Sequence, residues 1–299
     1  MKTNLSRSVC RSSFRQPKLE RRFFVLMFIF TLSLVSIMTT SCSTGTGELK
    51  KQVKQLSNRL GVLEDTQAIR NLHNAYGYYI DKCLYEDVVD LFADDGEVHF
   101  MGGIYRGKEK GVRRLYVGEF LQDFTGGKPG PVPGFLLDHL QMQDVIHVAP
   151  DGKTAKARFR CFMQAGAHES SKAAIAESAR KLKQPLMRWW EGGIYENSYV
   201  KVDGVWKIQV LNYNPLWHAD YATGWGYTKP NYVPTGAPKL YPENPKGPDA
   251  VEDPLPTLWP NTRIVPFPQQ RRMVSHLRGA PRLGPPPLTD LRKQIELGE

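Results

Sequence analysis

The chain has 299 residues, with 40 lysines and arginines against 30 acids, a formal net charge of +10 and a pI of about 9.4. Seven of the basic residues and one acid, Glu20, precede Cys42, so +6 belongs to this leading segment and +4 remains for the rest. Much of that remainder lies near the C-terminus and forms no stripe along a predicted helix, which argues against nucleic-acid binding.

Residues 1–41 are typical of a targeting segment. A positive n-region precedes an apolar run from Phe23 to Met38 that is short for a membrane span. Thr39-Thr40-Ser41-Cys42 then resembles the cleavage box of bacterial lipoproteins, in which the cysteine becomes the lipidated first residue. We therefore expect export, lipidation of Cys42 and an outer-membrane anchor facing the periplasm. An uncleaved N-terminal anchor and a plain signal peptide are the alternatives.

Residues 42–64 are predicted to be a tether followed by a heptad helix. Ser43 to Gly47 is rich in small residues, and Gly61 interrupts the helix that follows. The apolar residues of this helix recur four and three apart, as on a coiled-coil seam: Leu49, Val53, Leu56, Leu60 and Leu63. Two heptads are few for a coiled coil. The helix is therefore either an extension that packs on its own domain or a stalk that joins two copies in a homodimer.

The stretch from 65 to 101 predicts a helix, a turn, a second helix and a strand. On the first helix, residues at three- and four-residue steps share one face: Ile69, Leu72, His73, Tyr76, Tyr79 and Ile80. Asp81 stands at the seam between the two helices, directly after this aromatic and aliphatic run. The second helix carries Val88, Val89 and Phe92, and the alternating strand begins at Glu97.

The remainder of 65–213 predicts a mostly antiparallel sheet. A helix is expected at 108–120, then strands at 139–149 and 154–164 around Pro150-Asp151-Gly152, and a second hairpin of 194–202 and 205–213 around Asp203-Gly204. An Ala- and Lys-rich helix is expected at 166–183, as a lid over a pocket or as a solvated decoration. Helices followed by such a sheet indicate an α+β fold.

Residues 214–299 form a Pro-rich C-terminal arm with a basic tail. Hydrophobic periodicity disappears there, but tryptophans and tyrosines continue, and disordered segments are usually poor in aromatics. We expect an extended arm up to about Pro268 that lies on the domain or on a second protomer.

The spacing of Tyr76, Asp81 and Asp87-x-x-x-x-Phe92-Ala93-Asp94-Asp95 resembles the opening of the SnoaL-like branch of the nuclear-transport-factor-2-like superfamily. The resemblance covers residues 65–213. It implies a single cone-shaped domain in which a curved, mostly antiparallel sheet wraps around the N-terminal helices. Dehydratases, isomerases and binding domains all occur in this branch.

The resemblance also implies a site. Asp81 matches the family's catalytic aspartate, His139 its histidine and Tyr76 its assisting tyrosine. In such a site a histidine removes and returns a proton, a carboxylate orients it, and a tyrosine donates to a carbonyl oxygen. Each residue has a structural alternative: Asp81 as a helix cap, His139 bonded to backbone and Tyr76 in the core. Further candidates for substrate contact are Tyr79, Arg160, Trp190 and Tyr195.

The expected function is a cofactor-independent lyase or isomerase that acts on a hydrophobic oxygenated small molecule. The alternative is a non-catalytic binding or assembly lipoprotein of the same fold. No cofactor is expected, and no Cys or His pair has zinc-site spacing. Cys83 and Cys161 form either a disulfide or two separate buried thiols.

Overall fold

The computed structural model describes residues 18–168, 170, 188–229 and 239–262. The chain divides into two units between Glu64 and Asp65. Helix α1 (Lys18–Asp81) supplies the described part of the first unit and continues into the second. The tether predicted at 43–47 is therefore helical. Within the described residues, no helix has a stretch apolar and long enough to cross a membrane.

The last part of α1 is an amphipathic helix with its apolar face buried. Ile69, His73, Tyr76 and Ile80, at the predicted spacing, are each 5% exposed or less. The helix ends because Cys83 takes a left-handed φ of +52°, and Leu84 N–H then reaches back to the carbonyl of Tyr79 at 2.9 Å. Asp81 thereby becomes the last residue of the helix, and α2 (Tyr85–Asp90) starts just beyond it.

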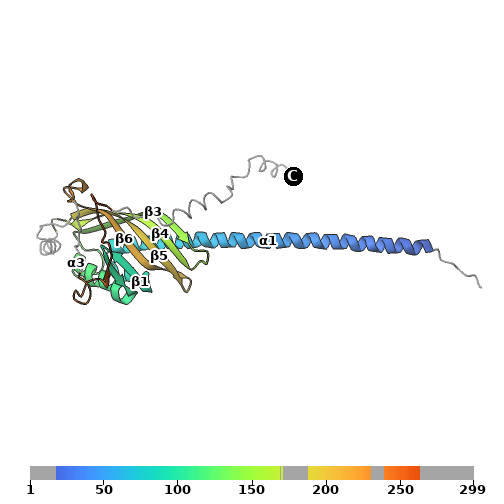
Figure 1. Ribbon diagram of the computed structural model, residues 1–299, viewed down its shortest axis with the longest axis horizontal. Helices are drawn as coiled ribbons and strands as arrows, with labels where there is room; N and C mark the ends of the chain where they lie inside the picture. Colours follow the sequence, from blue (N-terminus) through green and yellow to red (C-terminus); the bar gives the residue numbers. More distant parts are fainter. Residues whose placement is uncertain (1–17, 169, 171–187, 230–238, 263–299) are drawn as a thin grey trace, which may run out of the picture. The chain divides into compact units, whose positions relative to one another are not determined.

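One seven-stranded sheet has the order β3-β4-β5-β6-β1-β2-β7. Its strands are β1 (Phe92–Phe100), β2 (Gly103–Arg106), β3 (Phe135–Val148), β4 (Thr154–Ala167), β5 (Arg188–Val202), β6 (Val205–Asp220) and β7 (Ala250–Val251). Neighbours are antiparallel except β1 and β6. Figure 1 shows β3 to β6 side by side. The α+β class and both predicted hairpins are confirmed.

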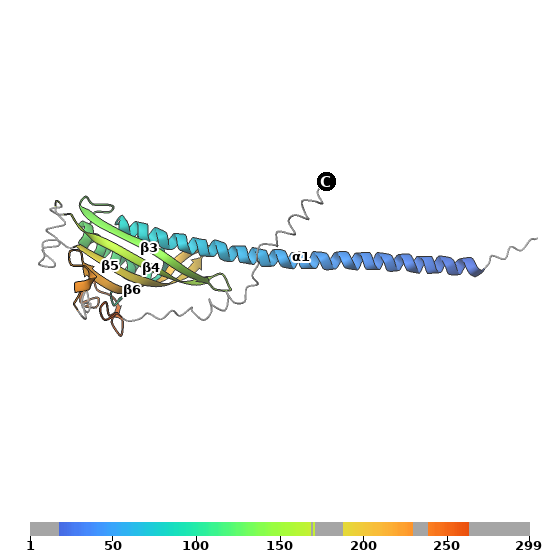
Figure 2. The ribbon, with the colours of Figure 1, turned by 90° about the horizontal axis from the view of Figure 1, so that it is seen from above.

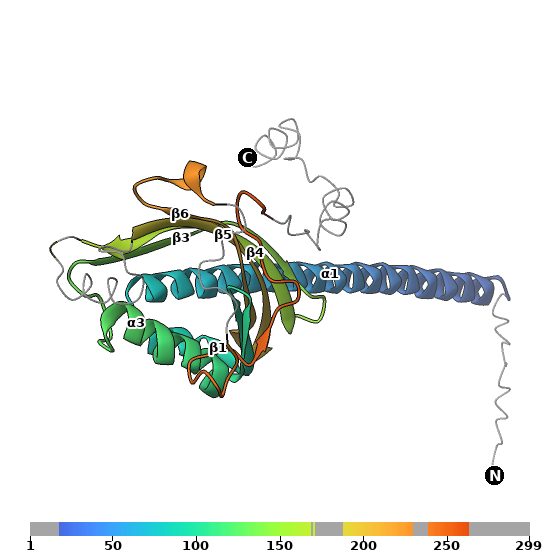
Figure 3. The ribbon, with the colours of Figure 1, turned by 60° about the vertical axis from the view of Figure 1, so that its left-hand side comes forward.

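The sheet curves around the end of α1, as Figure 2 and Figure 3 show. Its concave face carries alternate residues of each strand, such as Phe159 on β4 and Tyr195 on β5, both at most 2% exposed. A run of π-helical and α-helical turns lies on the same side: η1 (Gly107–Val112), η2 (Arg114–Phe120) and α3 (Leu121–Thr125). The helix predicted at 108–120 falls within this run.

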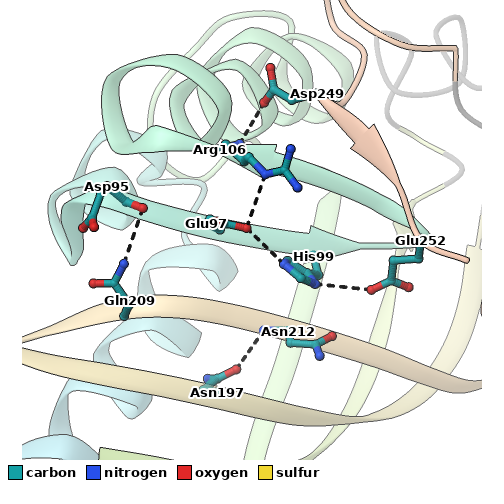
Figure 4. Close-up of polar contacts among 9 residues, drawn as sticks. All are labelled: Asp95, Glu97, His99, Arg106, Asn197, Gln209, Asn212, Asp249 and Glu252. Carbon is teal, nitrogen blue, oxygen red and sulfur yellow. Dashed lines mark hydrogen bonds and ion pairs between the residues drawn. The ribbon is translucent and has the colours of Figure 1, made fainter. Parts of the chain in front are cut away.

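Residues 239–262 pack on the domain, one of the two placements expected for this part of the arm. β7 pairs with β2, and His99 on β1 stands between two carboxylates, Glu97 at 3.3 Å and Glu252 at 3.4 Å (Figure 4). Near β7, the backbone N–H of Arg106 donates to Asp249 at 2.8 Å. This end of the arm is thus fixed by strand pairing and by charge together.

Two further expectations have definite outcomes. Cys83 and Cys161 are both free and buried, so the alternative of two separate thiols holds. Of the helix predicted at 166–183, the first two residues instead continue β4, and most of the remainder lies outside the described residues.

Candidate functional site

Asp81 lies at the end of α1 with its carboxylate turned toward β3. Its Oδ1 atom is buried and accepts no hydrogen bond from any described residue. Burial raises the pKa of Asp81 to about 6, helped by the negative charge of Asp138, while the backbone N–H of His139 acts in the opposite direction. The result is a partly buried carboxyl group with a vacant acceptor atom and a pKa near neutrality.

His139 on β3 is 5% exposed and points into the concave face. Its Nε2 lies 2.9 Å from the Tyr195 hydroxyl. The amide nitrogen of Gln141 lies 3.2 Å from its Nδ1 and 3.4 Å from its Nε2. Burial lowers the pKa of His139 to about 4, so the ring is neutral at physiological pH.

Tyr76 completes the predicted trio. Its hydroxyl lies 3.1 Å from that of Tyr116, and its ring packs edge-on to His139 at 6.4 Å between centroids. Burial raises the pKa of Tyr76 to about 12, so the hydroxyl keeps its proton. The structure thus places Tyr76 beside the His139 ring. The expected contact between Asp81 and His139 involves the histidine's backbone N–H, and no bond between carboxylate and ring occurs among the described residues.

His73 is a central residue that the sequence did not single out. It is fully buried, stacks on Phe159 at 3.7 Å between centroids, and places Nε2 2.8 Å from the Gln141 carbonyl oxygen. On its other side, Nδ1 lies 3.3 Å from the Asn197 amide nitrogen. Burial lowers its pKa to about 3. The available signal was its place on the same helical face as Tyr76.

A glycine allows α1 and β3 to come this close. A Cβ atom on Gly77 would stand 2.8 Å from the Gln141 side chain, closer than two carbons can pack. Gln141 can therefore pass beside the helix and contact His73 and His139 together. The site consists of α1, β3 and β5 side chains joined by one amide.

A family model for the SnoaL-like domain matches residues 61–212, just over half of the chain. The chain belongs to the SnoaL-like domain family. Among curated proteins, none matches the chain in sequence.

Solved structures similar to this SnoaL-like domain include a putative scytalone dehydratase from Novosphingobium aromaticivorans, with 19% identity, 54% of this chain and 90% of that chain covered, and a TM-score of 0.40. A hexachlorocyclohexane dehydrochlorinase, LinA-type3 from Novosphingobium barchaimii, has 17% identity, covers 55% and 94%, and has a TM-score of 0.42. At this identity the likeness concerns the fold alone.

The four residues predicted to contact substrate in the SnoaL-like domain are not brought together. Tyr195 joins the His139 network and is buried. Tyr79 is half-buried at the edge of the core. Arg160 is exposed and Trp190 points to the opposite, convex face, because both occupy positions of β4 and β5 that alternate with the buried ones.

Trp190 instead lines a pocket on the convex face. This pocket has a volume of about 730 Å³ and combines strand residues with the ends of two loops. Phe162 stacks on Trp190 at 5.9 Å, and Trp225 meets Trp259 edge-on at 5.7 Å. The full lining is Phe162, Trp190, Leu216, Trp217, Gly224, Trp225, Trp259 and Thr262.

A second buried polar group shares the concave face with His139. The carboxylate of Glu191 is 2% exposed and accepts a hydrogen bond of 2.5 Å from the Tyr213 hydroxyl. His218 lies 3.7 Å from its other oxygen. Burial raises the pKa of Glu191 to about 7 and lowers that of His218 to about 4. The described residues bring no three His, Cys, Asp or Glu side chains together as a metal site.

Proposed function

We propose that this domain is a cofactor-independent lyase or isomerase of the dehydratase type, acting on a hydrophobic oxygenated small molecule. Membership of the SnoaL-like family supports a general role in processing small molecules. The proposal goes further, to a proton transfer at carbon. It rests on the Asp81 carboxylate, whose buried Oδ1 has no donor among the described residues.

A vacant acceptor atom in an apolar setting is what a carbon base requires. A carboxylate that is satisfied by several donors is a weak base, whereas burial without donors raises its pKa toward the working pH. Asp81 is close to this second environment, because its Oδ1 has no donor among the described residues and only the backbone N–H of His139 acts as a donor that lowers its pKa. Tyr76, Tyr195 and His139 belong to a buried hydrogen-bonded group on the concave face, whose donors would stabilise negative charge on a substrate oxygen that reaches them.

The proposed reaction is a proton transfer with or without loss of water. Asp81 takes a proton from the carbon next to a carbonyl, and the C–H electron pair forms a carbon–carbon double bond. In a dehydration the C–O bond of the β-hydroxyl breaks with its electron pair on oxygen. The protonated Asp81 returns the proton to this oxygen, so that water leaves and the carboxylate is restored. In an isomerisation the same proton returns to another carbon. Neither route needs a further reactant.

The aromatic side chains of the domain favour a flat, apolar substrate. Aromatic rings of four elements pack in a row: Phe120 of η2 contacts Phe124 of α3 at 5.3 Å between centroids, and Phe124 contacts Phe135 of β3 at 5.6 Å and Trp189 of β5 at 6.4 Å. The three phenylalanines are only partly buried. Such a wall suits a ring compound with few polar groups.

The test is Asp81→Asn in the purified full-length protein, assayed on a panel of hydroxylated ring ketones for loss of water. Asparagine keeps the shape and removes the base, so turnover should fall by two orders of magnitude or more, about the contribution of a general base, while binding survives. Asp138→Asn is the matched control: it keeps the base and, by removing a nearby negative charge, lowers the pKa of Asp81 and moves the acidic limb of the pH profile to lower pH. Full activity of Asp81→Asn would refute the proposal.

A binding role is the second candidate, and the convex-face pocket favours it. Its lining is mostly aromatic, and Trp225 and Trp259 are 59% and 40% exposed. If members of the same panel bind without turnover and Trp225→Ala abolishes binding while Asp81→Asn does not, the protein is a ligand-binding domain.

We also propose that the chain is exported and lipidated at Cys42. The support is the Thr39-Thr40-Ser41-Cys42 sequence after a basic and apolar leader. Incorporation of a labelled fatty acid by the wild type, and its loss in Cys42→Ser, would support the anchor. Labelling that is absent from both proteins would refute it.

Homodimerisation through the heptad segment is a further proposal. Leu49, Val53, Leu56, Leu60 and Leu63 are each more than half exposed on α1 in the single chain. Light scattering of the full-length protein should give a dimer, and Leu56→Glu should convert it to a monomer. A wild-type monomer would rule this interface out.

A further inference from the structure

A bulge in β6 fixes the end of the arm to the convex face of the sheet. The register of β5 and β6 shifts between Gly192 and Gly193, which leaves Leu216 of β6 as an extra residue with no partner on β5. The Leu216 carbonyl accepts two hydrogen bonds of 2.8 Å from the arm, one from the backbone N–H of Trp259 and one from the Thr262 hydroxyl. The bulge therefore provides the acceptor that holds this end of the arm.

The loop after β6 is joined to the same end of the arm. It contains the short 3₁₀-helix η3 (Trp225–Tyr227), and the Trp225 carbonyl accepts a hydrogen bond of 2.9 Å from the Trp259 indole N–H. The two indole rings also meet edge-on at 5.7 Å between centroids. One side of the convex-face pocket is therefore a wall of two indoles from separate loops, and this wall is complete only when the arm is docked on β6.

The other side of the pocket is the sheet itself. Phe162 of β4 lies 5.9 Å from Trp190 of β5 and 5.9 Å from Trp217 of β6, between ring centroids. A Cβ atom on Gly192 would lie 2.3 Å from the Trp217 indole, so this ring rests directly on the backbone of β5. Three neighbouring strands thus present one aromatic surface to the pocket.

The lining offers a ligand carbon surface and no charged partner. None of the described residues that line the pocket is acidic or basic. The indole N–H groups of Trp190 and Trp259 donate to backbone carbonyls at 3.4 Å and 2.9 Å, and the Thr262 hydroxyl donates to Leu216. A charged ligand would lose its hydration here without gaining a partner. The pocket therefore favours an uncharged molecule.

The size of the pocket indicates a small molecule and not a protein partner. Its volume of about 730 Å³ falls within the roughly 300–1,000 Å³ of small-molecule sites. Eight described residues line it, whereas a stable protein interface takes about 20–30 residues a side. A ligand in the pocket would cover Trp225 and Trp259, which are exposed in the protein alone.

We infer that the convex-face pocket binds an uncharged, flat ring compound between the aromatic surface of the sheet and the wall formed by Trp225 and Trp259, and that docking of the arm completes the site. The inference develops the second candidate function. It does not depend on proton transfer at Asp81, because the two sites lie on opposite faces of the sheet. No described lining residue is an acid or a base, so this site binds without chemistry.

The test uses N-phenylnaphthylamine, an uncharged ring compound whose fluorescence rises in apolar surroundings, titrated into the full-length protein. Anilinonaphthalene sulfonate has the same rings with a negative charge and is the matched ligand. We expect saturable binding of the uncharged probe, and binding of the sulfonate that is weaker by about tenfold or more. Equal affinities for the two probes would overturn the assigned ligand class.

Three variants locate the probe. Trp225→Ala and Trp259→Ala each remove one ring of the wall and should weaken binding of N-phenylnaphthylamine about tenfold. Tyr227→Ala is the matched control, because it removes an exposed ring of the same 3₁₀-helix that does not line the pocket, and it should leave the affinity unchanged. If both tryptophan variants bind the probe as the wild type does, the site lies elsewhere and the inference fails.

Hydrogen exchange tests the part assigned to the arm. A ligand that requires the docked arm should raise the protection factor of the Trp259 amide, which donates to the Leu216 carbonyl. The Tyr241 amide is the control, because it donates to the Pro248 carbonyl at 2.9 Å within the arm and neither residue lines the pocket. An unchanged protection factor at Trp259 with saturating probe would show that the arm does not complete the site.

Asp81→Asn separates this site from the concave one. The variant should bind N-phenylnaphthylamine as the wild type does, whether or not it loses turnover. Loss of probe binding in Asp81→Asn would mean that the probe binds on the concave face, and the inference would be overturned. Full activity of Asp81→Asn with normal probe binding would refute the proton transfer and leave the convex-face site standing.

Discussion

Glu191 provides a quantitative test of how strongly the concave face excludes water. Its carboxyl is 2% exposed, and burial raises its pKa from an ordinary 4.5 to about 7. His218 does not compensate as a cation, because burial lowers its own pKa to about 4. One pKa unit corresponds to about 1.4 kcal/mol, so the ionised carboxylate destabilises the folded state by about 3 kcal/mol.

The sign of the pH dependence follows from linkage. The folded state holds the Glu191 proton more tightly than the unfolded state, so this group lowers the free energy of unfolding as the pH rises from 4.5 to 7. Below pH 4.5 the group is protonated in both states and adds no penalty. Glu191→Gln resembles the protonated form and can still accept from the Tyr213 hydroxyl.

The measurement is urea unfolding of the full-length wild type and of Glu191→Gln at pH 4.5 and pH 8. The variant should match the wild type at pH 4.5 and exceed its free energy of unfolding by up to about 3 kcal/mol at pH 8. Glu243→Gln removes a charge from an exposed position and is the control, with no comparable gain. A Glu191→Gln variant that is less stable than the wild type at both pH values would refute the reasoning, because it would mean that Tyr213 and His218 stabilise the ionised carboxylate.

Burial lowers the pKa of His99, but the Glu252 and Glu97 carboxylates outweigh burial, so the pKa is raised above its ordinary value. The contact between His99 and Glu252 should therefore be strongest below the ordinary histidine pKa and should weaken as the pH rises through the raised value. The protection factor of the Glu252 amide, which corrects for the base-catalysed rise of intrinsic exchange, should therefore fall between pH 6 and pH 8 in the wild type, and much less in His99→Gln. Gly193→Ala would place a methyl group 2.5 Å from the Tyr213 ring and should lower the free energy of unfolding by about 1–3 kcal/mol in a denaturant titration. Phe159→Ala removes the ring under His73 and should cost about 3–5 kcal/mol by the same measurement.

Each of these variants has a result that would contradict its argument. A protection factor at Glu252 that stays constant from pH 6 to pH 8 in the wild type would mean that His99 is not charged between the two carboxylates. Gly226→Ala, where a Cβ meets open space, controls for the loss of glycine, and equal effects at 193 and 226 would dismiss the steric explanation. If Phe159→Ala lowers the free energy of unfolding by less than about 1 kcal/mol, neighbouring side chains move into the space that the ring leaves.

Local signals predicted the elements that they encode directly. Asp203 and Gly204 both adopt positive φ, as a two-residue hairpin turn requires, and the sequence identified that hairpin. The buried face of the helix with Ile69, Tyr76 and Ile80 was predicted equally well, because its apolar residues recur at the three- and four-residue steps of a helix. Strand ends were less accurate: β3 begins at Phe135 and not at His139, because the loop composition before it conceals four further paired residues.

The site was only partly readable because its contacts join distant segments. Periodicity placed His73 on the buried face but could not reveal that Gln141, 68 residues later, would bond to it. Trp189 and Trp190 are both aromatic, and composition does not tell which one faces inward. The strand register decides this, and it turns Trp190 toward the convex pocket.

Two neighbouring glycines of β5 have a consequence for the evolution of this sheet. A Cβ on Gly192 would lie 2.3 Å from the Trp217 indole, and a Cβ on Gly193 would lie 2.5 Å from the Tyr213 ring. At Gly192 and Gly193 the backbone therefore carries no side chain, and an aromatic ring packs directly against it on each face of the sheet. A relative that acquires a side chain at 192 must reduce the ring at 217, and one that acquires it at 193 must reduce the ring at 213. Residues 192 and 217 should therefore covary with each other and with the lining of the convex pocket. Residues 193 and 213 should covary with each other and with Glu191, independently of the first pair.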